Sequence, residues 1–351
     1  MNFDCNADAE KIYNACKGLG TKEEDIIKVI GNRNLAQRHQ IRLAYFSKYN
    51  KDLLDVLDSE LSGDFGYLSR SLFLGPIQVL AMDLYKIFKK TGSAGGDIND
   101  IICCLSPSEI TALKAAYLED DDDAEDEPID LHAPEDNKLV LNYEGVKDKA
   151  RSLEKDIEKE TKGQHRDFLL KFINTNRREF TPEEIRSVAS SGRWDMLVDM
   201  QQVERNATAI HDATEGKAGK GNEVEVTRIL STASALDLRA MYDHYRDVYK
   251  VSMVDAISKA FKNPLRNAYN NVIMTAVDLR LLLVAQLYNA MHGLGTDERT
   301  LSRIFTIRSE IDLHNLRMLF QEKVGRSLGE MVKSDTSGDY RSLLLTILGE
   351  K

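Results

Sequence analysis

Two glycine-rich segments in this chain are each followed, at the same distance, by one acidic residue. Residues 18–21 and residues 293–296 both read Gly-Leu-Gly-Thr, and Glu60 and Asp335 lie 42 residues beyond the first glycine of each segment. A helix end leaves backbone carbonyls without partners, and glycine lets the chain turn so that such oxygens gather at one point. Carbonyl oxygens and a bidentate carboxylate are ligands that calcium prefers. The pattern therefore predicts two calcium sites, in which a single carboxylate leaves net positive charge for an anionic ligand such as a lipid phosphate.

Each part of this pattern also has a purely structural interpretation. The glycines can end helices as left-handed caps, and Glu60 and Asp335 can stabilise the first turn of the helix that follows. The calcium interpretation is favoured because the whole combination occurs twice with one spacing.

The two segments belong to a longer repeat. Residues 12–72 align without a gap onto residues 287–347 at a constant offset of 275, and apolar positions match apolar positions. The residues Thr21 and Glu24 form a capping box that should open a helix, and Thr296 should cap the equivalent helix. Apolar spacing in the first unit predicts five short helices, centred on residues 12–16, 26–30, 35–49, 53–61 and 65–73.

Two weaker copies of this unit lie between the strong ones. The second copy is interrupted by residues 119–149, whose run EDDDDAEDE is typical of a solvated loop. This acidic run lacks the glycine and the final glutamate of an EF-hand loop, so it is not expected to be a specific calcium site. A helical linker precedes the third copy and contains Trp194, expected to be a packing residue. The predicted organisation is a first repeat at 1–74, a second at 75–173, the linker at 174–202, a third repeat at 203–275 and a fourth at 276–351.

Composition limits the class of protein and its partners. The chain has 351 residues, of which 42% are hydrophobic and only six are Pro, which favours a helical globular protein. A formal charge of -10 repels nucleic acid and anionic membrane, so a membrane partner needs a bridging cation or a local basic patch. The N-terminus has no apolar signal region, and the longest apolar run, residues 281–285, is far too short for a membrane span. Four cysteines without a CxxC pair predict neither a disulfide framework nor a zinc site.

The doubled glycine loops and their remote acids resemble the annexin family, and the similarity covers essentially the whole chain. This resemblance implies an all-α fold of four annexin-like repeats, each of about five helices, that form a curved disc. It also implies reversible, calcium-dependent binding to anionic phospholipid membranes, with Ca²⁺ as the cofactor and phosphatidylserine-like lipid as the partner.

The resemblance assigns a role to individual residues of this sequence. The first site would use the carbonyls of Cys16, Gly18 and Gly20 with the carboxylate of Glu60, and the last would use Met291, Gly293, Gly295 and Asp335. Accessory metal contacts would come from Thr21, Glu23, Glu298 and Glu160. Lipid contacts would come from Lys17, Leu19 and Leu294, since apolar loop tips can enter the membrane interface.

The middle repeats depart from the family pattern. In the second repeat Lys90 stands in the glycine loop, although Glu160 keeps the carboxylate position. In the third repeat Ala260 replaces the acid, so we expect no strong site there. Only about five residues precede the first helix, which puts binding of partners through an N-terminal tail in doubt.

Several other residues have structural interpretations. Cys103 and Cys104 lie in a helix predicted to be buried, where free cysteine behaves as a small apolar residue. Arg33 and Arg308 are expected to hold helix ends by binding acids or carbonyls within their own repeats. No GxSxG, HExxH, Walker or dinucleotide motif is present, so an enzyme is not expected.

The sequence thus predicts a cytoplasmic protein, peripheral at the inner face of membranes, that binds anionic phospholipid through calcium in repeats 1 and 4. The alternative is a calcium-independent helical scaffold that binds proteins through the acidic insert and the linker. Chelation of calcium distinguishes the two. Self-association on membranes and surface exposure by unconventional export stay open.

Overall fold

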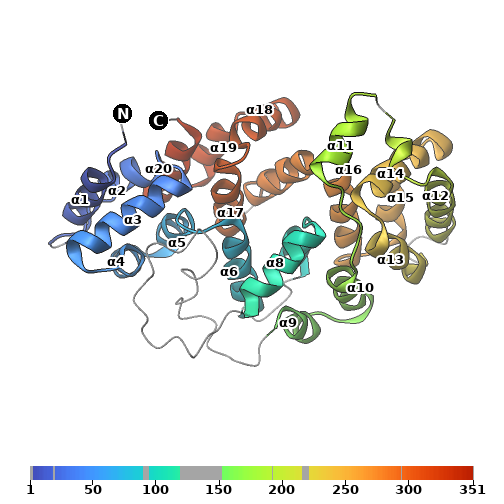
Figure 1. Cartoon of the computed structure of the whole chain (residues 1–351), viewed down its shortest axis with the longest axis horizontal. Helices are drawn as coiled ribbons and strands as arrows, with labels where there is room; N and C mark the ends of the chain where they lie inside the picture. The colour runs from blue at the N-terminus through green and yellow to red at the C-terminus, as the bar shows by residue number, and fades with distance from the viewer. Residues whose placement is uncertain are drawn as a thin grey trace. The chain divides into compact units, whose positions relative to one another are not determined.

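The computed structural model describes residues 3–18, 20–89, 95–118, 152–191, 193–215, 221–293 and 295–350. In these ranges all regular secondary structure is helical and no strand occurs (Figure 1). The predicted all-α fold class is confirmed. The acidic insert at 119–149 and the second repeat's glycine loop, including Lys90, lie outside the described residues apart from Lys89.

The helices fall into groups of five. We call α1–α5 the first repeat, α6–α10 the second, α12–α15 with the first half of α16 the third, and the second half of α16 with α17–α20 the fourth. The helix bounds are α1 (Cys5–Ala15), α2 (Glu23–Ile30), α3 (Leu35–Tyr49), α4 (Leu53–Glu60), α5 (Gly63–Ser71), α6 (Pro76–Lys89), α7 (Gly95–Ile102), α8 (Pro107–Leu118), α9 (Leu153–Glu160), α10 (Gly163–Asn174), α11 (Pro182–Ala189), the 3-10 helix η1 (Trp194–Met196), α12 (Met200–Thr214), α13 (Glu223–Thr232), α14 (Ala235–Tyr249), α15 (Met253–Ala260), α16 (Leu265–Ala290), α17 (Glu298–Ser309), α18 (Leu313–Val324), α19 (Leu328–Asp335) and α20 (Gly338–Leu348).

Local sequence explains most of these helix ends. The carboxylate of Asp4 accepts the amides of Asn6 and Ala7 and so begins α1. A capping box between Asn34 and Gln37 begins α3. Most of the helices of the repeats bury an apolar stripe of the kind that the sequence spacing predicts.

The chain divides into two compact units, and one unit contains both the N-terminal part and the C-terminal part of the chain. This unit takes the described residues up to Asp83 and those from Leu283 onward, so it contains the first and fourth repeats. Here α5 packs on α17 and α20, and α2 packs on α20. The approach is close, since a Cβ added to Gly31 would lie 2.8 Å from Cγ2 of Thr346. Both predicted calcium loops therefore belong to one unit.

A buried ion pair lies within this unit. Asp83 has no exposed surface, and its carboxylate is 3.0 Å from Nη1 of Arg303, which is also buried. Arg299 adds a second cation at 3.6 Å, and the Tyr67 hydroxyl donates to the same carboxylate. Burial and this carboxylate together hold the pKa of Tyr67 well above its usual range. Removal of one partner from such a pair leaves an uncompensated charge and costs about 3 to 5 kcal/mol.

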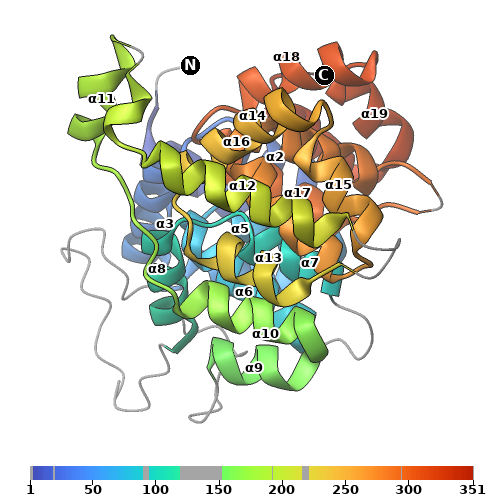
Figure 2. The same cartoon turned by 90° about the vertical axis from the view of Figure 1, so that its right-hand side faces the viewer.

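The second unit takes described residues 84–118 and 152–282. Helix α12 packs on α13 and α14, and α10 packs on α9 and α13 (Figure 2). Asn99 connects two elements of this unit, because its amide nitrogen donates to the Pro264 carbonyl at 2.9 Å while its oxygen lies 2.7 Å from Nε2 of His165. Burial lowers the pKa of His165 to about 4, so the ring is neutral at pH 7.

Helix α16 bends at Asp278, whose backbone is extended, with φ at −162° and ψ at 98°. By length and composition α16 would be able to cross a membrane, a test that core helices also pass. The break divides it into segments that are each shorter than the roughly 20 residues a span requires.

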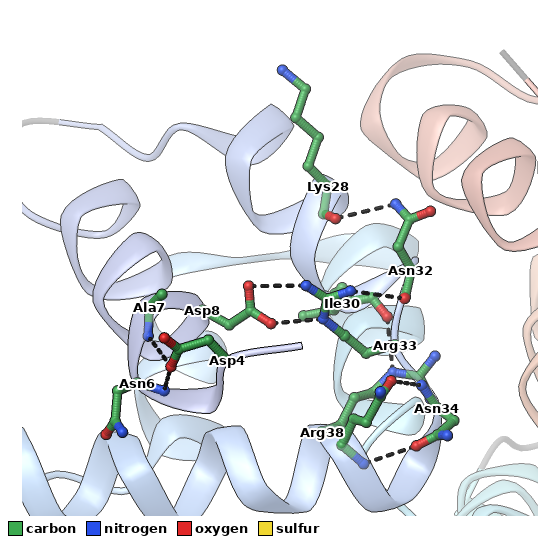
Figure 3. A network of polar contacts seen from close by, with 11 residues as sticks. Asp4, Asn6, Ala7, Asp8, Lys28, Ile30, Asn32, Arg33, Asn34 and Arg38 are labelled. Carbon is green, nitrogen blue, oxygen red and sulfur yellow. Dashed lines mark hydrogen bonds and ion pairs between the residues drawn. The ribbon is translucent and has the colours of Figure 1, made fainter. Parts of the chain in front are cut away.

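Two predictions about individual residues are confirmed. Arg33 binds Asp8 through Nε at 2.6 Å and Nη2 at 3.3 Å within the first repeat (Figure 3), and Arg308 binds Asp312 through Nε at 2.7 Å within the fourth. Cys103 is buried at 1% exposure, as expected of a small apolar residue. The prediction that Cys103 and Cys104 lie within a buried helix is wrong, because α7 ends at Ile102, both cysteines lie in the turn that follows, and Cys104 is half-buried. The side chain of Trp194 is outside the described part of the chain.

Candidate functional site

The paired glycines of the two loops have nearly the same backbone φ angles. In the first repeat Gly18 and Gly20 have φ of 116° and 82°, and in the fourth Gly293 and Gly295 have φ of 119° and 86°. A φ near 117° is open almost only to glycine. The sequence repeat at this position is therefore also a repeat of local geometry.

Equivalent hydrogen bonds close both loops. The amide of Lys22 donates to the Ala15 carbonyl at 2.9 Å, and the amide of Asp297 donates to the Ala290 carbonyl at 2.8 Å. Each bond joins the last turn of one helix to the residue that precedes or caps the next. The intervening residues are held as a closed loop whose own carbonyls are not needed for helix bonding.

The six carbonyls predicted as ligands accept no hydrogen bond from any residue that the structure describes. They have lone pairs available, which is the condition a hard cation requires of its ligands. Each loop supplies three of them, at Cys16, Gly18 and Gly20 in the first repeat and at Met291, Gly293 and Gly295 in the fourth.

The structure brings each remote acid to its loop. The Thr21 hydroxyl donates to Oε2 of Glu60 at 3.0 Å, and the Thr296 hydroxyl donates to Oδ2 of Asp335 at 2.7 Å and contacts the Asp335 carbonyl at 2.9 Å. Glu60 is exposed and Asp335 is half-buried, so neither carboxylate is sequestered in the core.

The predicted capping role of the two threonines is wrong. Lys22 occupies the N-cap of α2 without a side-chain bond. Asp297 caps α17 by accepting the amide of Thr300. The hydroxyls of Thr21 and Thr296 instead bind carboxylates that lie 39 residues away in the sequence. The capping pattern did not predict these hydrogen bonds to the remote acids. Both threonines directly follow the second glycine of their loop, and this shared position was a signal that could have indicated a common role.

Negative charge surrounds the first loop. Burial, together with the negative charges of Glu60 and Glu23, raises the pKa of the Cys16 thiol to about 11. The thiol is therefore protonated at neutral pH and is a poor metal ligand. Glu23 lies near enough to the loop to influence it electrostatically, as its predicted accessory role requires.

In the fourth repeat the start of α17 is fixed to α20. The Tyr340 hydroxyl donates to the Glu298 carbonyl at 2.8 Å and lies 3.0 Å from the Ser302 hydroxyl. Burial raises the pKa of Tyr340 above its usual range. This contact holds the backbone of Glu298, the second residue predicted as an accessory contact, beside the loop.

The remaining predicted residues are not brought into a comparable site. Glu160 lies 3.5 Å from the Lys159 ammonium. Lys17 is exposed, with Nζ 5.8 Å from the centre of the Tyr13 ring. Leu19 and Leu294 lie outside the described residues.

In the third repeat, the position equivalent to the remote acid is taken by a buried residue whose backbone carbonyl is hydrogen-bonded. Ala260 stands where the other repeats carry an acid and is 3% exposed. The Gly221 amide donates to the Ala260 carbonyl at 3.4 Å. A Cβ on Gly221 would lie 2.4 Å from the Phe261 ring, so the chain packs directly against this turn.

No cluster of three or more His, Cys, Asp or Glu side chains suited to a metal occurs in the described ranges. A site built from backbone carbonyls and one carboxylate contains no such cluster. Fold and site together define a helical repeat protein with paired carbonyl-rich loops, a class that binds hard cations.

Comparison with known proteins gives the family. A family model described as Annexin matches residues 7–72 and 283–347. The chain is 35% identical to annexin A13 of Mus musculus over 346 residues, which cover 99% of this chain and 95% of that protein. It therefore belongs to the annexin family, whose members are calcium-dependent phospholipid-binding proteins.

Solved structures agree with this assignment. Chicken annexin V matches with a TM-score of 0.80 and 30% identity, covering 99% of this chain and 96% of that one. The calcium-bound annexin (Sm)1 matches with a TM-score of 0.78 and 28% identity, covering 99% of this chain and 91% of that one.

Proposed function

We propose that this annexin binds anionic phospholipid reversibly through calcium held in the first and fourth repeats. The first site would use the carbonyls of Cys16, Gly18 and Gly20 and the carboxylate of Glu60. The fourth would use Met291, Gly293, Gly295 and Asp335. Phosphatidylserine on the cytoplasmic face of a membrane is the expected lipid.

The observation that carries this proposal is the combination of free carbonyls with a tethered carboxylate. The loop oxygens are not used by any described donor, and a threonine hydroxyl holds the acid beside each loop. The residues therefore fit a calcium ion, which prefers several neutral oxygens and a carboxylate.

Electrostatics explains why lipid would be needed. The chain carries a formal charge of -10 and is repelled by anionic membrane. Bound calcium would supply local positive charge that a lipid phosphate can approach. With one carboxylate per site, the dissociation constant without lipid is expected on the order of 10⁻⁵ to 10⁻³ M. Lipid and calcium then strengthen each other's binding by linkage, and two sites in one unit add avidity.

The test is co-sedimentation with phosphatidylserine vesicles at 0.15 M salt over a calcium series. The variant Glu60→Gln with Asp335→Asn should require on the order of tenfold more calcium, because each site loses its charged ligand. The matched control is Asp64→Asn with Asp339→Asn, which removes the same charge from exposed acids four residues further along.

The control should sediment at the calcium concentration of the parent. If the Glu60 and Asp335 double variant does so as well, the assignment of the two sites is wrong. If the parent shows no calcium-dependent sedimentation at all, the helical scaffold becomes the better description.

A further inference from the structure

The turn between α15 and α16 has the opposite charge from its counterpart in the first repeat. Residues 257–266 contain Lys259, Lys262 and Arg266 and no acidic residue, whereas residues 57–66 contain three acids and no basic residue. The two windows have equivalent positions, since α15 and α4 are both eight residues long and end at Ala260 and Glu60. The formal charge therefore changes from -3 to +3 at the turn that carries the predicted calcium ligand.

The basic side chains of this turn are available to a ligand. Lys259 and Lys262 are exposed and Arg266 is half-buried. None of the three forms an ion pair or a side-chain hydrogen bond with any residue that the structure describes. Unpaired basic residues that are close in the sequence and not neutralised are a recognised feature of surfaces that bind phosphate.

The turn is held in place by the rest of the unit. Asn99 donates to the Pro264 carbonyl at 2.9 Å, and Asn270 donates to the Ser258 hydroxyl at 2.9 Å. The Gly221 amide also donates to the Ala260 carbonyl. A backbone fixed at several points reduces the entropy lost when a ligand binds.

An exposed apolar residue lies near this turn and favours lipid as the source of the phosphate. Val224, at 68% exposure, is in the first turn of α13 and three residues after Gly221, whose amide donates to the Ala260 carbonyl. Basic residues beside an exposed apolar side chain are typical of interfacial membrane contacts. Two acids flank Val224, and one of them, Glu225, is paired with Arg228 at 2.6 Å, which reduces its repulsion of an anion.

We propose that the third repeat binds phosphate-bearing anions, lipid headgroups above all, directly through Lys259, Lys262 and Arg266 and without calcium. This inference extends the proposed function, and its experiment is arranged so that the two can fail separately. The third repeat then differs from the first and fourth in two ways, because it lacks the calcium ligand and carries basic side chains at the same turn. Basic side chains there replace the bridging cation that an acidic protein otherwise needs.

The experiment measures binding to phosphatidylserine vesicles in chelator at 0.05 M salt, where charge interactions are less screened. It uses the full chain carrying Glu60→Gln and Asp335→Asn, so that neither predicted calcium site contributes. Adding Lys259→Gln and Lys262→Gln should weaken binding by about 25-fold, or roughly fivefold for each lysine. The matched control is Arg246→Gln with Lys250→Gln, in the last turn and at the C-cap of α14, which removes the same charge and should leave binding unchanged.

A second measurement identifies the source of the phosphate. Inorganic phosphate is titrated while the amide NMR signals of residues 257–266 are followed. Vesicle binding lost only in the Lys259 and Lys262 variant supports a lipid contact. Signal changes with inorganic phosphate but no vesicle binding support a site for soluble phosphate. The proposal is overturned if the two variants bind vesicles equally and phosphate leaves these signals unmoved, whatever the outcome of the calcium experiment.

Discussion

Replacement of Gly293 by alanine tests whether the shape of the loop, rather than the mere presence of its oxygens, governs calcium binding. Gly293 has φ of 119°, and no neighbouring atom in the described part of the chain lies within 4 Å of an added Cβ. A steric clash with neighbours is thereby excluded, and the whole cost comes from a backbone conformation that alanine avoids. Such strain is worth about 1 to 3 kcal/mol.

Because the loop is open, it can relieve this strain by changing its backbone conformation. The carbonyls then no longer converge on the proposed calcium position. The cost then appears mainly in calcium affinity, as a loss of roughly 5-fold to 150-fold. Isothermal titration with calcium in a Glu60→Gln background separates the fourth repeat from the first, whose site is weakened by the loss of its carboxylate. Thermal unfolding in chelator, measured in parallel, should change little.

Gly325 supplies the control. It ends α18 with φ of 79°, and among the residues that the structure describes no neighbouring atom lies within 4 Å of an added Cβ. Gly325→Ala should lower the unfolding free energy by about 1 kcal/mol and leave calcium affinity unchanged. Equal calcium affinities for Gly293→Ala and Gly325→Ala would refute the argument that loop geometry sets the affinity.

Three further predictions concern side chains. Thr296→Val should weaken calcium binding in the fourth repeat by roughly fivefold, the value of about one hydrogen bond to Asp335, and Thr296→Ser should restore it in the same titration. Burial lowers the pKa of His165 to about 4 from about 6.5 unfolded, so stability is complete above pH 6.5 and falls by up to about 3 kcal/mol towards pH 4. Urea unfolding at several pH values should show this slope in the parent and a shallower one in His165→Gln. Arg303→Met should lower the unfolding free energy by up to about 3 kcal/mol, because the buried Asp83 carboxylate loses its nearest cation and keeps the more distant Arg299 and the Tyr67 hydroxyl, and adding Asp83→Asn should recover part of that loss.

Helices were the most predictable part of this protein. Their apolar spacing and caps are local properties, and the gapless alignment of residues 12–72 with 287–347 doubles the signal. The acidic partners of the glycine loops were also predictable, because an internal repeat exposes a constant spacing between distant residues.

Contacts between distant residues were less predictable when no repeat marked them. The sequence gives Thr21 the same local context as a helix cap, and a hydroxyl satisfies either a backbone amide or a carboxylate. Only the packing of α4 against its neighbours places Glu60 within 3.0 Å of that hydroxyl. The capping prediction failed because the tertiary contact offered a charged acceptor, which forms the stronger bond.

The sequence by itself determined the helices, the loop conformations that require glycine, and the positions of the two acids, since each depends on local residue chemistry repeated along the chain. Tertiary structure alone decided that Arg303 neutralises Asp83 across 220 residues and that Gly221 packs on Phe261 and bonds to Ala260 in the third repeat. The physical reason is that burial sets the strength of these contacts. A charge or an amide acquires its partner only when folding removes water from both.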